Sequence, residues 1–304
     1  MDAKLNDYLC GLIHKKGIKG QFYFSKRELF LNGSSDPLNE KDFSKAKGLI
    51  HRYPDRVVLT ITNKCFAYCR FCFRKDNWRN FGGFDLDRAA SYIQQNRSIR
   101  EVLISGGDPF FLSNDRLKQI LTKIRAIKHI KFIRIGTRVL TSYPMRIDEQ
   151  TIQMLTAYKP IWLAIHINHP DEITHQFKEA AKRFIDNGFP IVSQTVLLKG
   201  LNDDVFILEK LFCRLTELNI KPYYLFGCDQ AKGNNGFRVP IEKALSIMER
   251  LRGSISGLCV PNFAFDLPEG MGKVVVEPNR IIKKQGNIYR FRNFEGKEIE
   301  YIDV

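Results

Sequence analysis

Short apolar runs alternate with amphipathic stretches along this chain, and the alternation restricts the fold more than any other feature of the sequence. The apolar runs are rich in β-branched residues, which is typical of buried strands, and the stretches between them have the period of helices. Strands that alternate with helices form a parallel sheet with right-handed crossovers. We therefore expect an α/β fold, a partial (β/α)6 barrel whose reactive face lies at the carboxyl ends of the strands.

The expected elements define three regions of the chain. Six strands are predicted near Arg56–Thr62, Glu101–Ser105, Phe132–Gly136, Ile161–His166, Ile191–Leu197 and Tyr223–Gly227. Six helices are predicted near Leu86–Asn96, Asp115–Ala126, Asp148–Ala157, His175–Gly188, Asp204–Leu218 and Pro240–Arg252. These elements place the barrel over residues 51–252. Residues 1–50 are predicted to form an N-terminal helical cap, with a helix around Glu40–Arg52, and residues 253–304 a C-terminal extension.

The composition indicates a cytoplasmic enzyme with one large domain. A chain of 304 residues with 44% hydrophobic content can bury a barrel-sized core. It has no apolar run of about 18 residues that could span a membrane, and its N-terminus lacks the apolar core of a signal peptide. Seven cysteines, three of them clustered, indicate a reducing compartment rather than a disulfide framework.

The chain is strongly basic, with a formal net charge of +15. Its lysines and arginines are spread along the sequence, with only short clusters such as Lys15–Lys16 and Lys283–Lys284. Spread charge is typical of a solvated surface that attracts anionic ligands weakly. Because no basic stripe is interleaved with aromatic residues, nucleic-acid binding is not expected. A basic, metal-stabilised nucleic-acid-binding protein stays as the alternative from a different class.

Cys65, Cys69 and Cys72 form a C-x3-C-x2-C motif after the first predicted strand. Three thiolates can hold three irons of a [4Fe–4S] cluster and leave the fourth iron open, whereas structural zinc normally has four protein ligands. A zinc site or an accidental thiol cluster is the alternative. The spacing matches the cluster loop of the radical S-adenosylmethionine (SAM) enzymes, in which SAM binds the fourth iron.

Two glycine-rich turns follow in the sequence. Ser105, Gly106, Gly107 and Asp108 end the second predicted strand, and paired glycines let backbone amides approach a charged ligand closely. This turn resembles the segment that binds the amino group of SAM. The second turn, Asp266–Lys273, ends in a lysine whose amine, when partly desolvated, can form a Schiff base. Ordinary tight or surface turns are the alternatives.

Taken together, these motifs resemble the lysine 2,3-aminomutase family, radical SAM enzymes that also carry pyridoxal 5'-phosphate. The resemblance extends from about Leu49 to Gly296. Besides the segments above, it includes HRYPDR at His51–Arg56, RIGTR at Arg134–Arg138, HINHPDEIT at His166–Thr174, QTVLLKGLND at Gln194–Asp203, PYY and CD within Pro222–Asp229, LRG, SG and VP within Leu251–Pro261, and RNFEG at Arg292–Gly296. It implies a barrel of the radical SAM type and an isomerase that moves the α-amino group of L-lysine to the β carbon.

The resemblance also implies where the cofactors lie. The family uses a [4Fe–4S] cluster, SAM and pyridoxal phosphate. Lys273 would be the catalytic residue that holds pyridoxal phosphate as an imine. Arg52, Tyr53 and Arg56 fall in the family segment near the cofactor phosphates and the adenosyl group, where guanidinium groups suit phosphate.

The substrate residues follow from the same resemblance. Arg74 matches the arginine that clamps the substrate α-carboxylate, and Asp229 and Asp266 match the two aspartates that take the distal ammonium of lysine. A helix cap or surface turn is the alternative for either aspartate. His166 and Gln194 match positions beside the adenosyl group, with neutral core or turn roles as the alternative.

The chain departs from the free-lysine enzymes of the family in two ways. They carry a cysteine-rich tail that, with a cysteine after the Val-Asn-Asp turn, holds an intersubunit zinc, whereas Asp204 stands at that position here and the chain stops soon after RNFEG. We therefore expect no intersubunit zinc site. The CRFCFR sequence and the short chain also resemble the branch that isomerises lysine for translation elongation factor P. The sequence around Asp266 is closer to that of the free-lysine enzymes.

The expected partners are a free amino acid, L-lysine first, and an electron donor such as flavodoxin or ferredoxin, with no membrane. The alternative within this enzyme class is another α-amino acid, such as arginine, or a different radical reaction.

Overall fold

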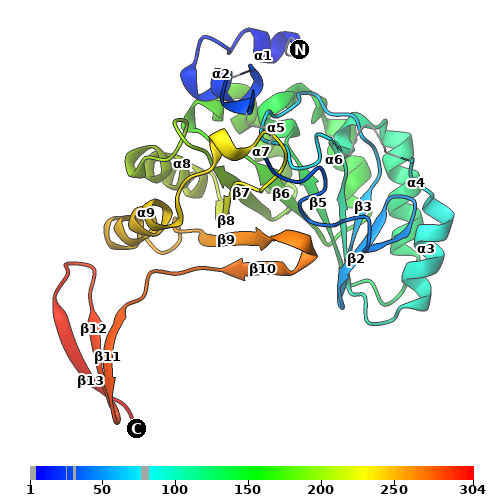
Figure 1. Ribbon diagram of the computed structural model, residues 1–304. Helices are drawn as coiled ribbons and strands as arrows, with labels where there is room; N and C mark the ends of the chain where they lie inside the picture. The colour runs from blue at the N-terminus through cyan, green and yellow to red at the C-terminus, as the bar shows by residue number, and fades with distance from the viewer. Residues whose placement is uncertain (1–4, 25, 30–31, 77–81) are drawn as a thin grey trace.

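The computed structural model describes residues 5–24, 26–29, 32–76 and 82–304 (Figure 1). A ten-stranded sheet forms the centre of the molecule, and each strand lies beside its neighbours in sequence. Its strands are β1 (Ser44–Ala46), β2 (Leu49–Tyr53), β3 (Arg56–Thr60), β4 (Glu101–Ser105), β5 (Phe132–Thr137), β6 (Ile161–His166), β7 (Ile191–Leu197), β8 (Ile220–Gly227), β9 (Asn262–Leu267) and β10 (Gly272–Val275). From β3 to β9 the strands are parallel, which confirms the predicted α/β barrel architecture.

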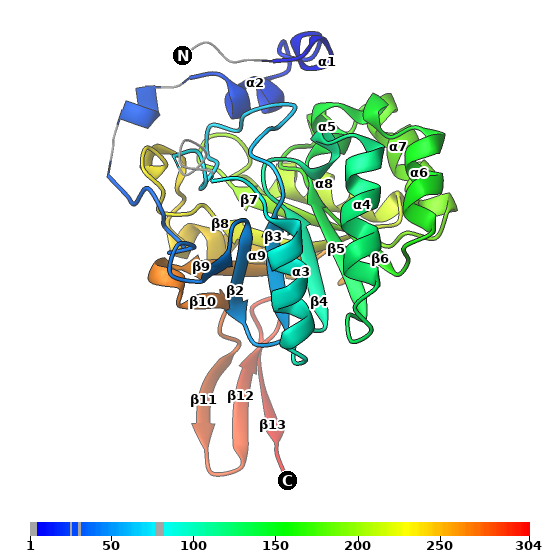
Figure 2. The same ribbon diagram turned by 90° about the vertical axis from the view of Figure 1, so that its right-hand side faces the viewer.

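Helices between the parallel strands cover the outer side of this sheet (Figures 1 and 2). They are α3 (Leu86–Gln95), α4 (Asn114–Arg125), α5 (Val139–Ser142), α6 (Glu149–Thr156), α7 (His175–Asp186), α8 (Val205–Glu217) and α9 (Ile241–Ser254). Most start at a polar cap that accepts a backbone N–H of the first turn, namely Asp85, Ser113, Asp148, Thr174 and Asp204. None of the helices in the described ranges is long and apolar enough to cross a membrane.

The strands direct alternate side chains to the helices and to the inside of the barrel. In β5, Ile133, Ile135 and Thr137 are buried, whereas Arg134 and Gly136 are only partly buried. Because side chains of a strand alternate between its two faces, the second set faces the interior of the barrel. Polar residues in the middle of a strand can therefore reach the site from the wall of the barrel.

The predicted helix around Glu40–Arg52 is wrong, because β1 and β2 occupy its second half. Gly48 between them has a φ of +77°, which a helix does not accept. The chain then turns back after Tyr53, and β2 pairs antiparallel with β3, with Tyr53 opposite Arg56. Earlier in the predicted cap, α1 (Asp7–Cys10) and α2 (Lys16–Phe22) are helical. Its residues 1–4, 25 and 30–31 lie outside the described part of the chain.

The sheet continues beyond the predicted end of the barrel at residue 252. β9 pairs parallel with β8, and β10 pairs antiparallel with β9, so that Lys273 lies opposite Asp266. A separate antiparallel sheet of β11 (Ile281–Gln285), β12 (Ile288–Arg292) and β13 (Glu298–Ile302) extends away from the barrel (Figure 1). The division of the chain into these three regions stays a prediction.

Candidate active site

The cysteine loop follows β3 and packs against the glycine turn after β4. The N–H of Gly107 donates to the carbonyl of Thr62 at 2.5 Å, and the N–H of Asp108 donates to the carbonyl of Lys64 at 2.8 Å. A Cβ on Gly106 would lie 2.4 Å from the Thr62 oxygen, and one on Gly107 would lie 2.2 Å from the Lys64 oxygen. The glycines therefore allow two loops to touch. The N–H groups of Gly107 and Asp108 thus already donate to the cysteine loop, and the binding of SAM by this turn stays a prediction.

Asp108 ties the end of β4 to the end of β5. Its buried carboxylate accepts hydrogen bonds from the Thr137 hydroxyl at 2.8 Å and from the backbone N–H of Arg138 at 2.8 Å. Burial raises the pKa of Asp108 to about 6, although these hydrogen bonds act in the opposite direction. Asp108, which is predicted to bind SAM, thus uses its carboxylate to hold the backbone at the ends of β4 and β5.

The three cysteines of the loop share one electrostatic environment. Burial raises the pKa of Cys65 far above its ordinary value, and the neighbouring Asp108, Cys69 and Cys72 raise it further. Burial likewise raises the pKa of Cys72 to about 11. Such thiols stay protonated until a bound metal removes the proton.

Cys65, Cys69 and Cys72 are predicted to hold a cluster rather than a single metal ion. No group of three or more Cys, His, Asp or Glu among the described side chains is arranged to hold one ion. A [4Fe–4S] cluster presents a different iron to each thiolate, so its ligand sulfurs need not converge on one point. The three thiols are near enough for their charges to act on one another, and the cluster assignment stays a prediction.

Arg138 connects the cysteine loop to α2 and was not among the predicted site residues. Its buried guanidinium donates to the sulfur of Cys69, to Glu172 at 2.9 Å and to Gln21 of α2 at 2.5 Å. Burial would lower the pKa of Arg138, but Cys69 and Glu172 raise it well above the ordinary value. An arginine directly after a buried strand, in the RIGTR motif, was the signal available in the sequence.

Lys273 lies in a partly desolvated position at the start of β10. Its Nζ is 2.7 and 2.9 Å from the two carboxylate oxygens of Asp266. It also lies 3.9 Å from the ring centroid of Phe226 and 5.1 Å from that of Tyr224. Burial lowers the pKa of Lys273, and Asp266 opposes this effect. The environment therefore favours the loss of the proton that a nucleophilic amine must release.

The residues predicted to lie near the cofactor phosphates are close to the turn that precedes Lys273. The hydroxyl of Tyr53 accepts a hydrogen bond from the backbone N–H of Lys273 at 2.8 Å, and Arg52 donates to the carbonyl of Gly270. The guanidinium of Arg56 lies 3.7 Å from the ring centroid of Tyr53. The structure thus brings all three side chains together beside the lysine.

A fourth cation, Arg134, reaches this corner from the wall of the barrel. It pairs with Glu101 at 2.7 Å, and its charge acts on both Lys273 and Tyr224. In the sequence, Arg134 stood out only as part of the RIGTR motif. Its position as an arginine facing inward from a central strand could be recognised only once the strand's interior face was known.

The predicted substrate residues form a group that joins the cysteine loop to Lys273. Arg74 is buried, and its charge acts on Cys72 and on Asp229. Burial raises the pKa of Asp229 to about 7, and repulsion from Asp266 adds to the shift, while Lys273 and Arg74 oppose it. The two carboxylates and the amine of Lys273 therefore lie close enough for their charges to act on one another.

His166 and Gln194 are direct neighbours on β6 and β7, where they are register partners. The Nε2 of His166 forms a hydrogen bond with Oδ1 of Asn168 at 3.1 Å, and its ring lies 5.6 Å from that of Phe71 in the cysteine loop. Burial lowers the pKa of His166 to about 3, so the imidazole is neutral at physiological pH. His166 therefore lies beside the cysteine loop, with Gln194 next to it on β7.

Comparisons with known proteins find two family models and several relatives that match this chain. Residues 59–209 match the family model of the radical SAM superfamily, and residues 248–303 match that of lysine-2,3-aminomutase. A putative L-lysine 2,3-aminomutase of Aquifex aeolicus is 44% identical over 88% of this chain and 74% of its own length. An L-lysine 2,3-aminomutase of Acetoanaerobium sticklandii is 42% identical over 86% of this chain, and a glutamate 2,3-aminomutase of Clostridioides difficile is 37% identical over 88%. The chain spans 64% of the length of each of these last two relatives.

Solved structures show the same fold at low sequence identity. Native anSMEcpe with bound AdoMet and the Kp18Cys peptide has a TM-score of 0.51 and 15% identity, with 65% of this chain and 58% of that chain covered. A radical SAM methyltransferase from Sphaerobacter thermophilus has a TM-score of 0.50 and 17% identity, with 71% and 68% covered. These likenesses confirm the predicted fold class.

Proposed function

Because the chain belongs to the lysine 2,3-aminomutase family of radical SAM enzymes, we propose that it is an isomerase that moves the α-amino group of L-lysine to the β carbon. The family uses a [4Fe–4S] cluster, SAM and pyridoxal phosphate, as the motifs predicted. One observation supports lysine as the substrate: Asp266 already binds the primary ammonium of a lysine side chain, that of Lys273, with Asp229 beside it.

The cofactors supply the reactive chemistry in this proposal, namely a hydrogen-abstracting radical from SAM at the cluster and an aldehyde from pyridoxal phosphate. We assign the cluster to Cys65, Cys69 and Cys72. The neutral pair His166 and Gln194 would adjoin the adenosyl group.

The residues around Lys273 hold the other cofactor in our proposal. Arg52, Tyr53 and Arg56 would bind the phosphate group, because guanidinium and phenol groups donate well to phosphate. Arg134 adds positive potential at the same corner. The amine of Lys273 would form the imine with pyridoxal phosphate, and burial assists by lowering the pKa of this amine.

The negative charges of Asp229 and Asp266 would favour lysine over glutamate at the distal end of the substrate. An ammonium group between Asp229 and Asp266 gains two opposite charges, whereas the distal carboxylate of glutamate would be repelled by both. A guanidinium would also be attracted, so arginine is the alternative that needs an experiment. At the proximal end, we assign the α-carboxylate to Arg74.

The test is turnover of isotopically labelled amino acids under anaerobic conditions. The protein is loaded with iron, sulfide, SAM and pyridoxal phosphate, reduced chemically or by flavodoxin or ferredoxin as the proposed electron donor, and given L-lysine, L-arginine or L-glutamate. We expect β-lysine in the mass spectrum. No β-lysine beside rapid conversion of another amino acid would reject lysine as the substrate. A protein without iron or a pyridoxal absorption band would reject the enzyme class.

A further inference from the structure

Arg74, to which we assign the substrate carboxylate, already has a carboxylate partner. Its Nε lies 2.8 and 3.1 Å from the two oxygens of Glu40, and its Nη2 lies 2.6 Å from one of them. The two side chains are only 10% and 16% exposed. The remaining nitrogen, Nη1, has long contacts of 3.5 Å to the Ser105 hydroxyl and the Gly106 carbonyl. Glu40 therefore occupies the side of the guanidinium that binds a carboxylate through two nitrogens.

Glu40 comes from a segment, residues 34–43, that we call the strap. One end of the strap forms a bridge to Ala231: the N–H of Ser34 donates to Gln230 at 2.9 Å, and the carbonyl of Ser34 accepts from Lys232 at 2.9 Å. This end lies near Asp229, in the loop after β8. The strap is thus attached to the loop that carries one of the substrate carboxylates.

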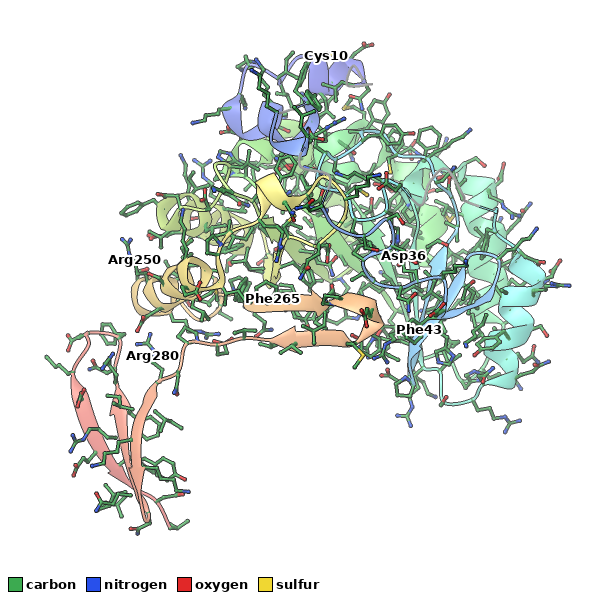
Figure 3. All side chains as sticks on the ribbon, in the orientation of Figure 1. Cys10, Asp36, Phe43, Arg250, Phe265 and Arg280 are labelled. Atoms are coloured by element: carbon green, nitrogen blue, oxygen red, sulfur yellow. The ribbon has the colours of Figure 1, made fainter. Side chains whose placement is uncertain are left out.

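The other end of the strap lies against the turn before Lys273. A Cβ on Gly270 would lie 2.2 Å from the ring of Phe43. Figure 3 shows Phe43 beside the turn that joins β9 to β10, and Asp36 nearer the barrel. Between the two ends, the carboxylate of Asp36 accepts the backbone N–H groups of Glu40 and Lys41 at 3.0 and 3.1 Å. The strap therefore links both sides of the site, with Glu40 between its two ends.

The ion pair between Arg74 and Glu40 has an electrostatic cause. Burial alone lowers the pKa of Arg74, but Glu40 more than offsets this and raises it above the ordinary value. A buried guanidinium without a partner is strongly unfavourable, so an empty site needs a carboxylate here. A substrate α-carboxylate offers the same geometry and the same charge as Glu40. The two cannot occupy the same pair of nitrogens, and each repels the other.

We propose that Glu40 is a specificity-determining residue that holds Arg74 in the empty enzyme and is displaced by the α-carboxylate of the amino acid. This inference rests on the proposed function, because it takes Arg74 as the carboxylate-binding residue. A ligand with a carboxylate compensates for the lost Glu40 contact, whereas a ligand without one does not. The exchange therefore makes the enzyme select for a free α-carboxylate.

The test measures binding to the loaded enzyme without a reductant, so that no turnover occurs. Calorimetry gives the Kd of L-lysine and of L-lysinamide, which lacks the carboxylate, for the wild type and for Glu40→Gln. The side-chain amide in Glu40→Gln competes with the substrate carboxylate for Arg74 more weakly than Glu40 does, because charge-assisted hydrogen bonds are roughly twice as strong as neutral ones. We expect Glu40→Gln to lower the Kd of L-lysine about fivefold, and that of L-lysinamide less than about twofold.

Controls separate this proposal from a structural effect. Asp42→Asn removes the same charge from the strap, but Asp42 accepts a hydrogen bond from the side chain of Asn39, whereas the carboxylate that binds Arg74 is that of Glu40, so the Kd should not change. Glu40→Ala should shift the Kd of L-lysine in the same direction as Glu40→Gln. The thermal midpoint and iron content show whether each variant folds and is loaded.

Two results would overturn the inference. Weaker L-lysine binding in both Glu40 variants would mean that Glu40 orients Arg74 and stays in place, and an unchanged Kd would mean that there is no competition. Arg74→Ala distinguishes failure of the proposed function: if it leaves L-lysine binding unchanged, the carboxylate lies elsewhere and the assignment of Arg74 is wrong.

Discussion

The proposed pocket for the distal ammonium should make lysine turnover depend on pH through Asp229. Burial and Asp266 raise the pKa of this carboxyl group to about 7. It is then about half ionised at pH 7, roughly a tenth ionised at pH 6 and about nine-tenths ionised at pH 8. Only the ionised form attracts the substrate ammonium, which itself stays protonated over this range. The sign is therefore fixed: binding improves as pH rises.

The magnitude follows from these fractions. Because kcat/KM reports the ionisation of the free enzyme, it should fall at least about fivefold between pH 7 and pH 6 and rise about twofold or more between pH 7 and pH 8. Loading pyridoxal phosphate on Lys273 removes a positive charge that lowers the pKa of Asp229, so the step begins at pH 7 or above.

The assay is the anaerobic conversion of labelled L-lysine at fixed ionic strength, with Asp229→Asn as the comparison. The variant lacks the titrating group, so this step should disappear from its pH profile. Its kcat/KM at pH 8 should be about thirtyfold lower, since an unpaired ammonium contact costs about 2 kcal/mol or more. A wild-type profile that is flat from pH 6 to pH 8, or the same step in Asp229→Asn, would refute the assignment.

Other predictions concern the remaining parts of the site. Alanine in place of Cys65, Cys69 or Cys72 should abolish turnover and the cluster spectrum. Activity in any one of these variants would contradict the cluster assignment. Lys273→Ala should lose the pyridoxal absorption band while keeping its iron, and a retained band would place the imine elsewhere. Gly107→Ala should lower stability by about 1–3 kcal/mol in thermal unfolding, because its Cβ would meet the Lys64 carbonyl, whereas Gly257→Ala has open space and should be neutral; equal stability of the two would argue against the loop contact. Arg138→Gln should cost about 3–5 kcal/mol because it leaves Glu172 buried without its charge partner, and a thermal midpoint like that of exposed Arg290→Gln would count against this network.

Local patterns in the sequence were enough to predict most of the barrel. β4, β6 and β7 begin and end at the predicted residues. Apolar alternation and polar helix caps act within one segment, so they can be read without knowing what packs against it. β8 begins at Ile220, before the predicted start at Tyr223. Pro222 has no N–H to donate, and a register shift in the pairing with β7 accommodates it within the strand.

The sequence by itself determined the order of strands and helices, the cysteine loop and the lysine turn, because each depends on residues close together in the chain. Only the tertiary structure decided that residues 44–53 are strands, since β2 exists by pairing with β3. It also decided the partners of the buried arginines: Arg74 meets Glu40 across 34 positions, and Arg138 meets Gln21 across 117. Side chains such as these pair where folding brings distant segments of the chain together. The periodicity of one segment carries no information about which distant segment it will meet.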